Sequence, residues 1–272
     1  MSVAARTLTG MATLPNPLPT LATSGLELPP GILVDATVDG PWHEPLLWYA
    51  NGLASPGSWA ALRDAGRSLG LLPVLIDGGA RDQWPEAWDL DPGGTSYPGD
   101  HDAEDVLSEV WDAYAADELN TEHAWPGLAP VPAAEGPDSP ETLAAEIADM
   151  LTADGMTLEY ARFALVPARR SADIPAAIGW SGPLNHENDV ARLCAVLRSW
   201  EDRFGIRVVA LGFDTLTVSV ARPPTTEAEA LALAAEHFAF CPDNIHQSSL
   251  DSLEKYAADA LLGRETWSFW WD

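Results

Sequence analysis

The sequence predicts an α+β protein, with a mixed sheet flanked by helices in the C-terminal domain and a smaller mixed α/β module before it. Three observations predict this class. Between residues 46 and 77 a strand, a helix and a strand follow one another, as in a parallel crossover unit. An amphipathic helix over 187–204 leads into two short apolar strands, 206–211 and 216–220. The chain then ends in an aromatic segment, 266–272.

The elements before residue 141 fall into three parts. Residues 1–30 are rich in Thr, Pro and Ala and show no periodicity, which predicts a mobile tail. Residues 31–122 form the predicted N-terminal module, and the prolines of 123–140 predict a linker. Within the module we expect strands at 32–38, 46–50 and 71–77, and helices at 58–69 and 102–117.

Residues 141–272 form the predicted C-terminal domain. Ser139 and Pro140 are typical of a helix start, and Thr226 with Glu229 forms the pattern of a capping box. In this domain we expect strands at 162–168, 176–180, 206–211, 216–220 and 266–272, and helices that begin at 140 and cover 187–204, 226–240 and 250–262.

The terminal aromatic segment carries large side chains on both of its faces. Trp267, Phe269 and Trp271 share one face of a strand, while Ser268 and Trp270 share the other. Burying such side chains is worth several kcal/mol, at ~25 cal/mol per Å² of apolar surface. We therefore expect a strand that pairs with a neighbour in the sheet and is covered on both faces.

The charge of the chain is its most unusual property. Asp and Glu number 41 against 14 Lys and Arg, a formal net charge of −27. Residues 82–161 contain 20 of the acids and no Lys or Arg. Such a protein repels nucleic-acid phosphates and anionic membranes, so we expect neither as a partner, and a basic protein partner instead.

The two cysteines, Cys194 and Cys241, are too few for a disulfide framework. The N-terminal residues lack the pattern of a signal peptide, and no run approaches the ~18 apolar residues of a membrane span. We therefore expect a cytoplasmic protein with reduced thiols.

The C-terminal part contains three sequence features that occur together: EHFAFCPDN at Glu236–Asn244, LLGRETW at Leu261–Trp267, and the final WSFWWD. In these features residues 162–272 resemble a bacterial family described as domain of unknown function 4253. The resemblance implies kinship in fold and carries no assigned activity or cofactor. His246 stands where members of the family more often have an aromatic residue.

The main candidates for chemistry are His237, Cys241, Asp243 and His246. Imidazole, thiolate and carboxylate are all zinc ligands, although the spacing H-x3-C-x-D-x2-H matches no common zinc signature. The same residues could instead form a nucleophilic site, with Cys241 as thiolate, His237 or His246 as base and Asp243 as the orienting acid. A third interpretation is structural: Cys241 packs in the core, His237 bonds a buried carbonyl, and Asp243 or Asn244 caps a turn.

These observations lead to two functional hypotheses. The first is a non-enzymatic interaction protein that binds a basic partner through its acidic middle segment. The alternative is a hydrolase or a metal-dependent enzyme centred on His237, Cys241, Asp243 and His246. The sequence leaves the cofactor open.

Overall fold

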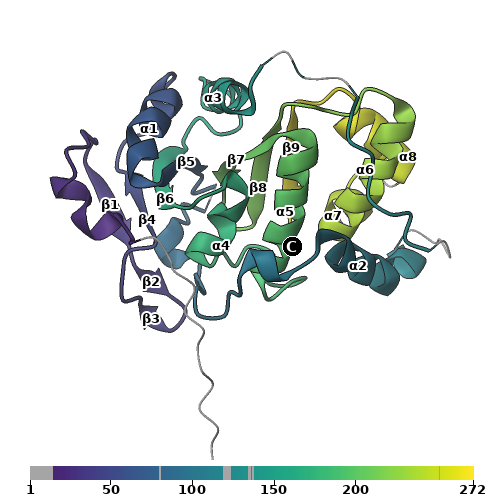
Figure 1. Cartoon of the computed structure of the whole chain (residues 1–272), viewed down its shortest axis with the longest axis horizontal. Coiled ribbons are helices and arrows are strands. Elements are labelled where there is room, and N and C mark those ends of the chain that lie inside the picture. Colours follow the sequence, from purple (N-terminus) through teal and green to yellow (C-terminus); the bar gives the residue numbers. More distant parts are fainter. Residues whose placement is uncertain (1–14, 80, 119–123, 134–135, 137, 251) are drawn as a thin grey trace, which may run out of the picture.

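A seven-stranded mixed sheet forms the centre of the computed structural model, which describes residues 15–79, 81–118, 124–133, 136, 138–250 and 252–272 (Figure 1). The strand order is β1-β4-β6-β5-β7-β8-β9, and every neighbouring pair is antiparallel except β5 with β7. The strands are β1 Gly31–Val34, β4 Leu47–Ala50, β5 Leu71–Ile76, β6 Arg162–Pro167, β7 Ile206–Leu211, β8 Thr215–Val220 and β9 Thr266–Trp270. A separate two-stranded sheet consists of β2 Ala36–Thr37 and β3 Gly40–Pro41.

Helices cover both faces of the large sheet. The α-helices are α1 Ser58–Gly66, α2 Ala103–Glu118, α3 Pro140–Leu151, α4 Ile174–Ile178, α5 Val190–Phe204, α6 Glu227–Phe240, α7 Asp243–His246 and α8 Leu253–Tyr256. Shorter turns are η1 Leu18–Thr23, η2 Arg67–Leu69, η3 Pro85–Ala87, η4 Pro98–Asp100 and η5 Ser171–Asp173, and η6 Ala257–Leu261 is a π-helical turn. None of the helices among the described residues has the length and apolar character needed to cross a membrane.

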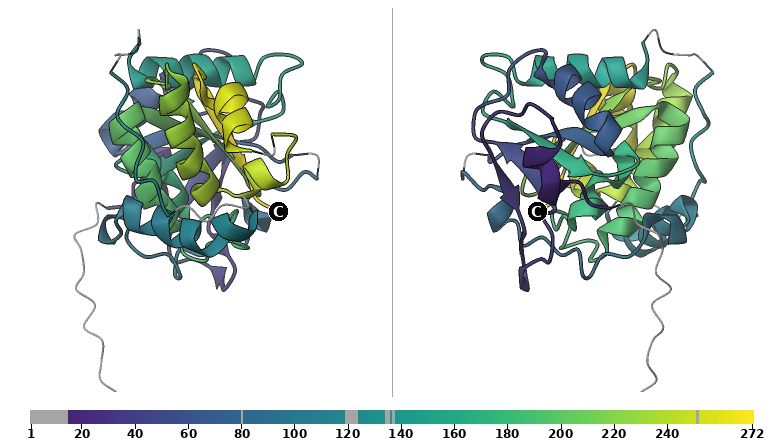
Figure 2. Two further views of the ribbon diagram at one scale, coloured as in Figure 1. Left: turned by 90° about the vertical axis from the view of Figure 1, so that its right-hand side faces the viewer. Right: turned by 60° about the vertical axis from the view of Figure 1, so that its left-hand side comes forward.

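Two apolar cores, one on each face of the sheet, follow from the period-two alternation of its strands. One core joins η1, α1 and α3 to alternate residues such as Leu71 and Leu75 of β5. The other joins α4, α5 and α6 to the intervening residues, such as Val74 and Ile76. Helix α2 packs on α5 and α6, and Figure 2 shows it across their lower ends. The predicted α+β class, with a mixed sheet flanked by helices, is confirmed.

The sheet contains strands from both of the modules that the sequence predicts. β6, from 141–272, lies between β4 and β5, which come from 31–122. β4 and β5 each run antiparallel to β6, so they are parallel to one another but do not pair. The expected crossover unit is therefore present, with β6 inserted between its two strands. The segments before and after the predicted linker at 123–140 contribute strands to the same sheet.

The predicted tail and linker both include ordered contacts. Residues 1–14 lie outside the described residues, but η1 follows at Leu18–Thr23, and Leu18 and Leu21 are buried. In the proline-rich segment, the backbone N–H of Ala129 donates to Glu236, and its carbonyl accepts from Arg203. The predicted tail thus contacts the core through apolar side chains, and the proline-rich segment contacts it through backbone hydrogen bonds.

The expected strand at 176–180 is wrong, because these residues belong to the end of α4 and the turn that follows it. Pro175 stands in the first turn of this helix, where a missing N–H costs nothing. Gly179 ends it in the left-handed conformation, with φ of 63°. The short apolar run between them carries no signal that separates a strand from a buried helical turn.

The terminal strand fits one half of its prediction. β9 pairs with β8, and Trp267, Phe269 and Trp271 are buried. The expectation that both faces are covered is wrong, because Ser268 is exposed and Trp270 is 38% exposed. Helix α3 contacts β7 and β8, so the helical layer on that face ends before it reaches β9.

Candidate functional site

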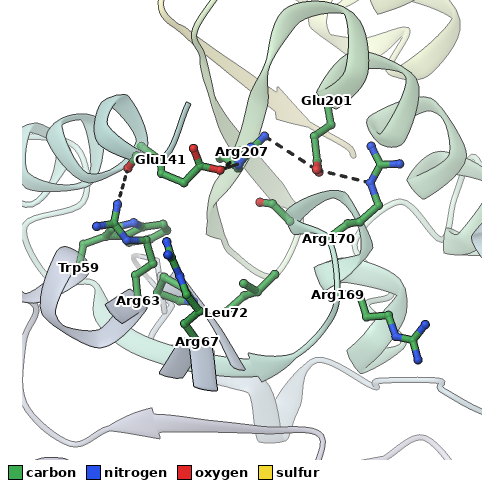
Figure 3. Close-up of a pocket in the computed structure, with 12 residues that line it drawn as sticks. Trp59, Arg63, Arg67, Leu72, Glu141, Arg169, Arg170, Glu201 and Arg207 are labelled. Atoms are coloured by element: carbon green, nitrogen blue, oxygen red, sulfur yellow. Dashed lines mark hydrogen bonds and ion pairs between the residues drawn. The ribbon is translucent and has the colours of Figure 1, made fainter. Parts of the chain in front are cut away.

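Five arginines gather around one cavity of about 260 Å³ on the α1 and α3 side of the sheet (Figure 3). We call it the arginine pocket; it is lined by Trp59, Arg63, Arg67, Leu72, Pro73, Glu141, Ala144, Arg169, Arg170, Ser171, Glu201 and Arg207. The chain has only 14 basic residues against 41 acidic ones. A pocket lined by five arginines and two glutamates is therefore a local reversal of the overall charge.

Several elements place these arginines together. Trp59, Arg63 and Arg67 are spaced by four residues, so they lie on one face of α1 and its continuation into η2. Arg169 and Arg170 follow the end of β6, and Arg207 is the second residue of β7. The strand alternation turns Arg207 away from the core formed by α5 and toward the layer formed by α1 and α3.

Three of the arginines have carboxylate partners. Arg207 donates from Nη2 and Nε to Glu141 Oε1, at 2.6 and 3.2 Å. Its Nη1 also lies 3.8 Å from Glu201, which is 3.4 Å from Arg170 Nε. Arg63 donates to the backbone carbonyl of Glu141 at 3.1 Å and pairs with Asp64 outside the pocket. Glu141, Arg207, Glu201 and Arg170 thus form a row of alternating negative and positive side chains in the wall of the cavity.

The side chains of Arg67 and Arg169 are exposed and have no hydrogen-bond or ion-pair partner in the part of the chain that the structure describes. In Figure 3 Arg67 rises beside Arg63 toward Glu141, whereas Arg169 points away from the others. The hydroxyl of Ser171 accepts a hydrogen bond from the backbone N–H of Val208, which leaves its own proton free to donate. The pocket therefore offers donors that no acceptor among the described residues uses.

The electrostatics of Glu141 reflect these neighbours. Its partial burial alone would raise the pKa of the carboxyl, but hydrogen bonding to Arg207 and attraction to it outweigh burial and lower the pKa. Glu141 is therefore ionised at neutral pH and acts as a counter-ion within the pocket. Its side chain is still 40% exposed, so water competes with Arg207 for the carboxylate.

The residues singled out from the sequence lie elsewhere, at the ends of α6 and α7. His237 is buried among aromatic rings, with its centroid 4.8 Å from that of Trp200 and 4.7 Å from that of Trp267. Its Nδ1 lies 3.1 Å from the Tyr256 hydroxyl. Burial, and after it the charge of Arg203, lowers the pKa of His237 well below its ordinary value.

Cys241 is also buried, and its thiol donates to the carbonyl of Trp270 at 2.9 Å. Burial raises the pKa of Cys241 to about 12, which disfavours the thiolate that a nucleophile or a zinc ligand needs. Asp243 accepts hydrogen bonds from Gln247 and from the backbone N–H of Asp272, and pairs with His186 at 2.9 Å.

His246 is exposed on α7. Cys241 and Asp243 are thus held by partners outside the predicted set, and His237 faces Tyr256 and aromatic rings. Within the described ranges, the side chains form no group of three or more His, Cys, Asp or Glu that could hold a metal ion.

The segments EHFAFCPDN, LLGRETW and WSFWWD lie in adjoining elements near the C-terminus. Helix α6 leads through Cys241 and Pro242 into α7, and α7 lies against β9. The comparison with protein families found a match over a longer stretch that contains these segments. Residues 162–272 match the family described as Domain of unknown function (DUF4253). Searches against curated proteins and against solved structures found no match to the chain.

The arginine pocket extends beyond the DUF4253 match. Arg169, Arg170 and Arg207 belong to the matched residues, whereas Arg63 and Arg67 precede them. The pocket leaves little trace in the sequence, because its arginines come from three separate stretches of the chain. Only the spacing of four between Arg63 and Arg67, and the adjacent pair 169–170, could have indicated it in so acidic a protein.

Proposed function

We propose that this protein binds a small anionic ligand in the arginine pocket. The observation that supports the proposal is the concentration of five arginines around one cavity in a chain of net charge −27. Like charges placed this close repel each other. Four carboxylates, Glu141, Glu201, Asp64 and Asp202, pair with Arg63, Arg170 and Arg207 and offset part of that repulsion, whereas the side chains of Arg67 and Arg169 have no counter-ion among the described residues. A bound anion would offset the rest.

The side chains of the pocket suit oxyanions in particular. A guanidinium presents N–H donors in a planar fork that matches two oxygens of a carboxylate or a phosphate. Arg67 has a whole fork without a partner among the described residues, and the hydroxyl of Ser171 adds a neutral donor. The apolar side chains of Leu72 and Pro73 line the same cavity, so the ligand would carry a non-polar part as well.

Calorimetric titration of the full chain with inorganic phosphate, sulfate and acetate tests the proposal. We expect saturable binding of at least one anion, weakened about 10-fold or more by Arg67→Ala, because a charged hydrogen bond is worth about 1.5–3 kcal/mol. Arg81→Ala is the matched control: Arg81 is exposed, lies outside the pocket and carries the same charge. Equal weakening by both substitutions, or no binding of any anion, would overturn the proposal.

A second candidate function is the recognition of a basic protein through the acidic middle segment. Nine exposed carboxylates between residues 82 and 112 favour it, and of these only Glu109 has an ion pair in the described part of the chain, with Arg192. They are Asp82, Glu86, Asp89, Asp100, Asp102, Glu104, Asp105, Glu109 and Asp112. Such a field attracts a basic partner and speeds its association. In this hypothesis the protein acts in the cytoplasm and performs no catalysis.

Carboxyl-to-amine cross-linking of a co-purified partner tests this second function. We expect cross-links from lysines of the partner to the carboxylates of α2, and their loss when Glu104, Asp105 and Asp112 are all changed to the neutral amides. Binding should also weaken steeply with added salt. Cross-links that map elsewhere on the chain would contradict this function and leave the arginine pocket untouched.

A further inference from the structure

The guanidinium of Arg207 uses only one of the two carboxylate oxygens of Glu141. Both Arg207 donors, Nε and Nη2, point to the same oxygen, Glu141 Oε1. The most favourable arrangement places each donor on its own oxygen. The other oxygen, Oε2, forms no hydrogen bond within the described structure. An oxyanion with more oxygens could use the Arg207 fork more fully than Glu141 does.

The charge balance of the pocket points to a ligand with more than one negative charge. Five arginines and two glutamates line the cavity. Asp64 and Asp202, outside the lining, pair with Arg63 and Arg170. If the Glu141 carboxylate swings away from Arg207, Glu201 is the one carboxylate among the lining residues that remains near Arg67, Arg169 and Arg207. A monocarboxylate would replace the single negative charge of Glu141 with another single charge. A phosphate dianion would supply one negative charge more than Glu141 does. The protein as a whole is strongly acidic, so the arginines attract an anion only when it is close to the pocket.

The size and the lining of the cavity indicate that the ligand is more than a free phosphate. A cavity of about 260 Å³ approaches the size of sites that hold small organic ligands. Trp59, Leu72, Pro73 and Ala144 supply an apolar part of its wall. The arginines and this apolar part lie in the same cavity, so they can contact the two ends of one small molecule.

We infer that the ligand is a phosphate monoester of a small organic molecule, and that its phosphate replaces the Glu141 carboxylate on Arg207. This inference rests on the proposed anion-binding function. Glu141 then acts as an internal competitor: it holds the arginines in place and leaves Arg207 when the phosphate binds. The exposure of its side chain makes this exchange inexpensive, because a partly solvated ion pair contributes little stability.

A calorimetric comparison of three probes tests the ligand class in the wild-type chain. The probes are inorganic phosphate, phenyl phosphate and benzoate, which separate the phosphate, the ring and the carboxylate. We expect phenyl phosphate to bind at least about 10-fold more tightly than benzoate, because of its second charge, and more tightly than inorganic phosphate, because of its ring. Benzoate binding as tightly as phenyl phosphate would overturn the ligand class while leaving anion binding intact.

Glu141→Gln tests the exchange. It removes the competing charge and keeps the shape, so we expect phenyl phosphate to bind about 3- to 10-fold more tightly. Glu146→Gln is the control, since Glu146 is exposed on the same helix and lies outside the pocket. Unchanged or weaker binding in Glu141→Gln would overturn the exchange. Absence of binding by all three probes to the wild-type chain would instead refute the proposed function itself.

Discussion

The carboxamide of Asn244 pairs with the backbone of Trp270 at the outer edge of the sheet: Oδ1 accepts from the Trp270 N–H at 3.1 Å. Its Nδ2 donates to the carbonyl of Ser268 at 2.7 Å. One side chain thus takes the place of a neighbouring strand along part of β9. Edge strands with unpaired backbone groups are sites of unwanted association, and Asn244 closes this one.

We predict that Asn244→Ala lowers the free energy of unfolding by about 1–3 kcal/mol, since it leaves two backbone groups of β9 without partners. Asn244→Asp is the informative comparison, because it keeps the acceptor for Trp270 and loses the donor to Ser268. Because a carboxylate oxygen then faces the Ser268 carbonyl and both groups are acceptors, we expect a loss at least as large as that of the alanine variant in urea denaturation. Equal stability of the alanine variant and the wild type would show that water replaces the carboxamide without cost.

The second prediction concerns Glu236, which is fully buried. Its carboxylate accepts from two nitrogens of Arg203, at 2.5 and 2.8 Å, from the Trp200 indole at 2.8 Å and from the Ala129 N–H at 2.6 Å. We predict that Glu236→Ala costs about 3–5 kcal/mol, because Arg203 is left as a nearly buried charge without a partner. Denaturant unfolding measures this.

Arg203→Met combined with Glu236→Leu should recover part of that loss, since apolar residues of similar volume can replace a buried ion pair. If the double variant were less stable than Glu236→Ala, the geometry of the ion pair itself would be the stabilising feature, and the explanation by an unpaired charge would be wrong.

The third prediction is a dependence of stability on pH. Burial, and then the charge of Arg203, lowers the pKa of His237, so the folded state binds fewer protons than the unfolded chain below its ordinary pKa of 6.5. Stability is therefore complete above that value and falls with decreasing pH, by at most about 1.4 kcal/mol per unit from this group.

Thermal melts between about pH 7.5 and pH 5.5 measure this effect. His237→Phe should flatten the dependence, and His43→Gln, at an exposed imidazole, should not. An equally steep dependence in His237→Phe would assign the effect to other groups.

The fourth prediction separates the two faces of β9. Phe269 is buried and stacks on Trp200 with ring centroids 5.5 Å apart, whereas Trp270 is 38% exposed. We expect Phe269→Ala to cost about 3–5 kcal/mol and Trp270→Ala about 1 kcal/mol or less. Similar losses from both substitutions in chemical denaturation would mean that the outer face of β9 is covered in solution.

The sequence alone determined the parts of this protein that depend on local periodicity and on end signals. The helix Val190–Phe204 follows from apolar residues repeated at three and four, and Gly205 ends it. The capping box of Thr226 and Glu229 marks the start of α6 as expected. Alternation predicted the buried residues of β9, and the terminal motifs predicted the family match. Each of these signals is a local pattern, formed by residues that are close together in the sequence.

Tertiary structure decided the rest, because contacts between distant residues leave no local pattern. The insertion of β6 between β4 and β5 depends on pairs such as Tyr49 with Ala164 and Ile76 with Arg162, which are far apart in the chain and which no alternation specifies. The burial of His237 and Cys241 depends on the aromatic residues of β9 folding over α6. The arginine pocket depends on α1, the end of β6 and β7 meeting at one place, so its charge becomes visible only when the chain is folded.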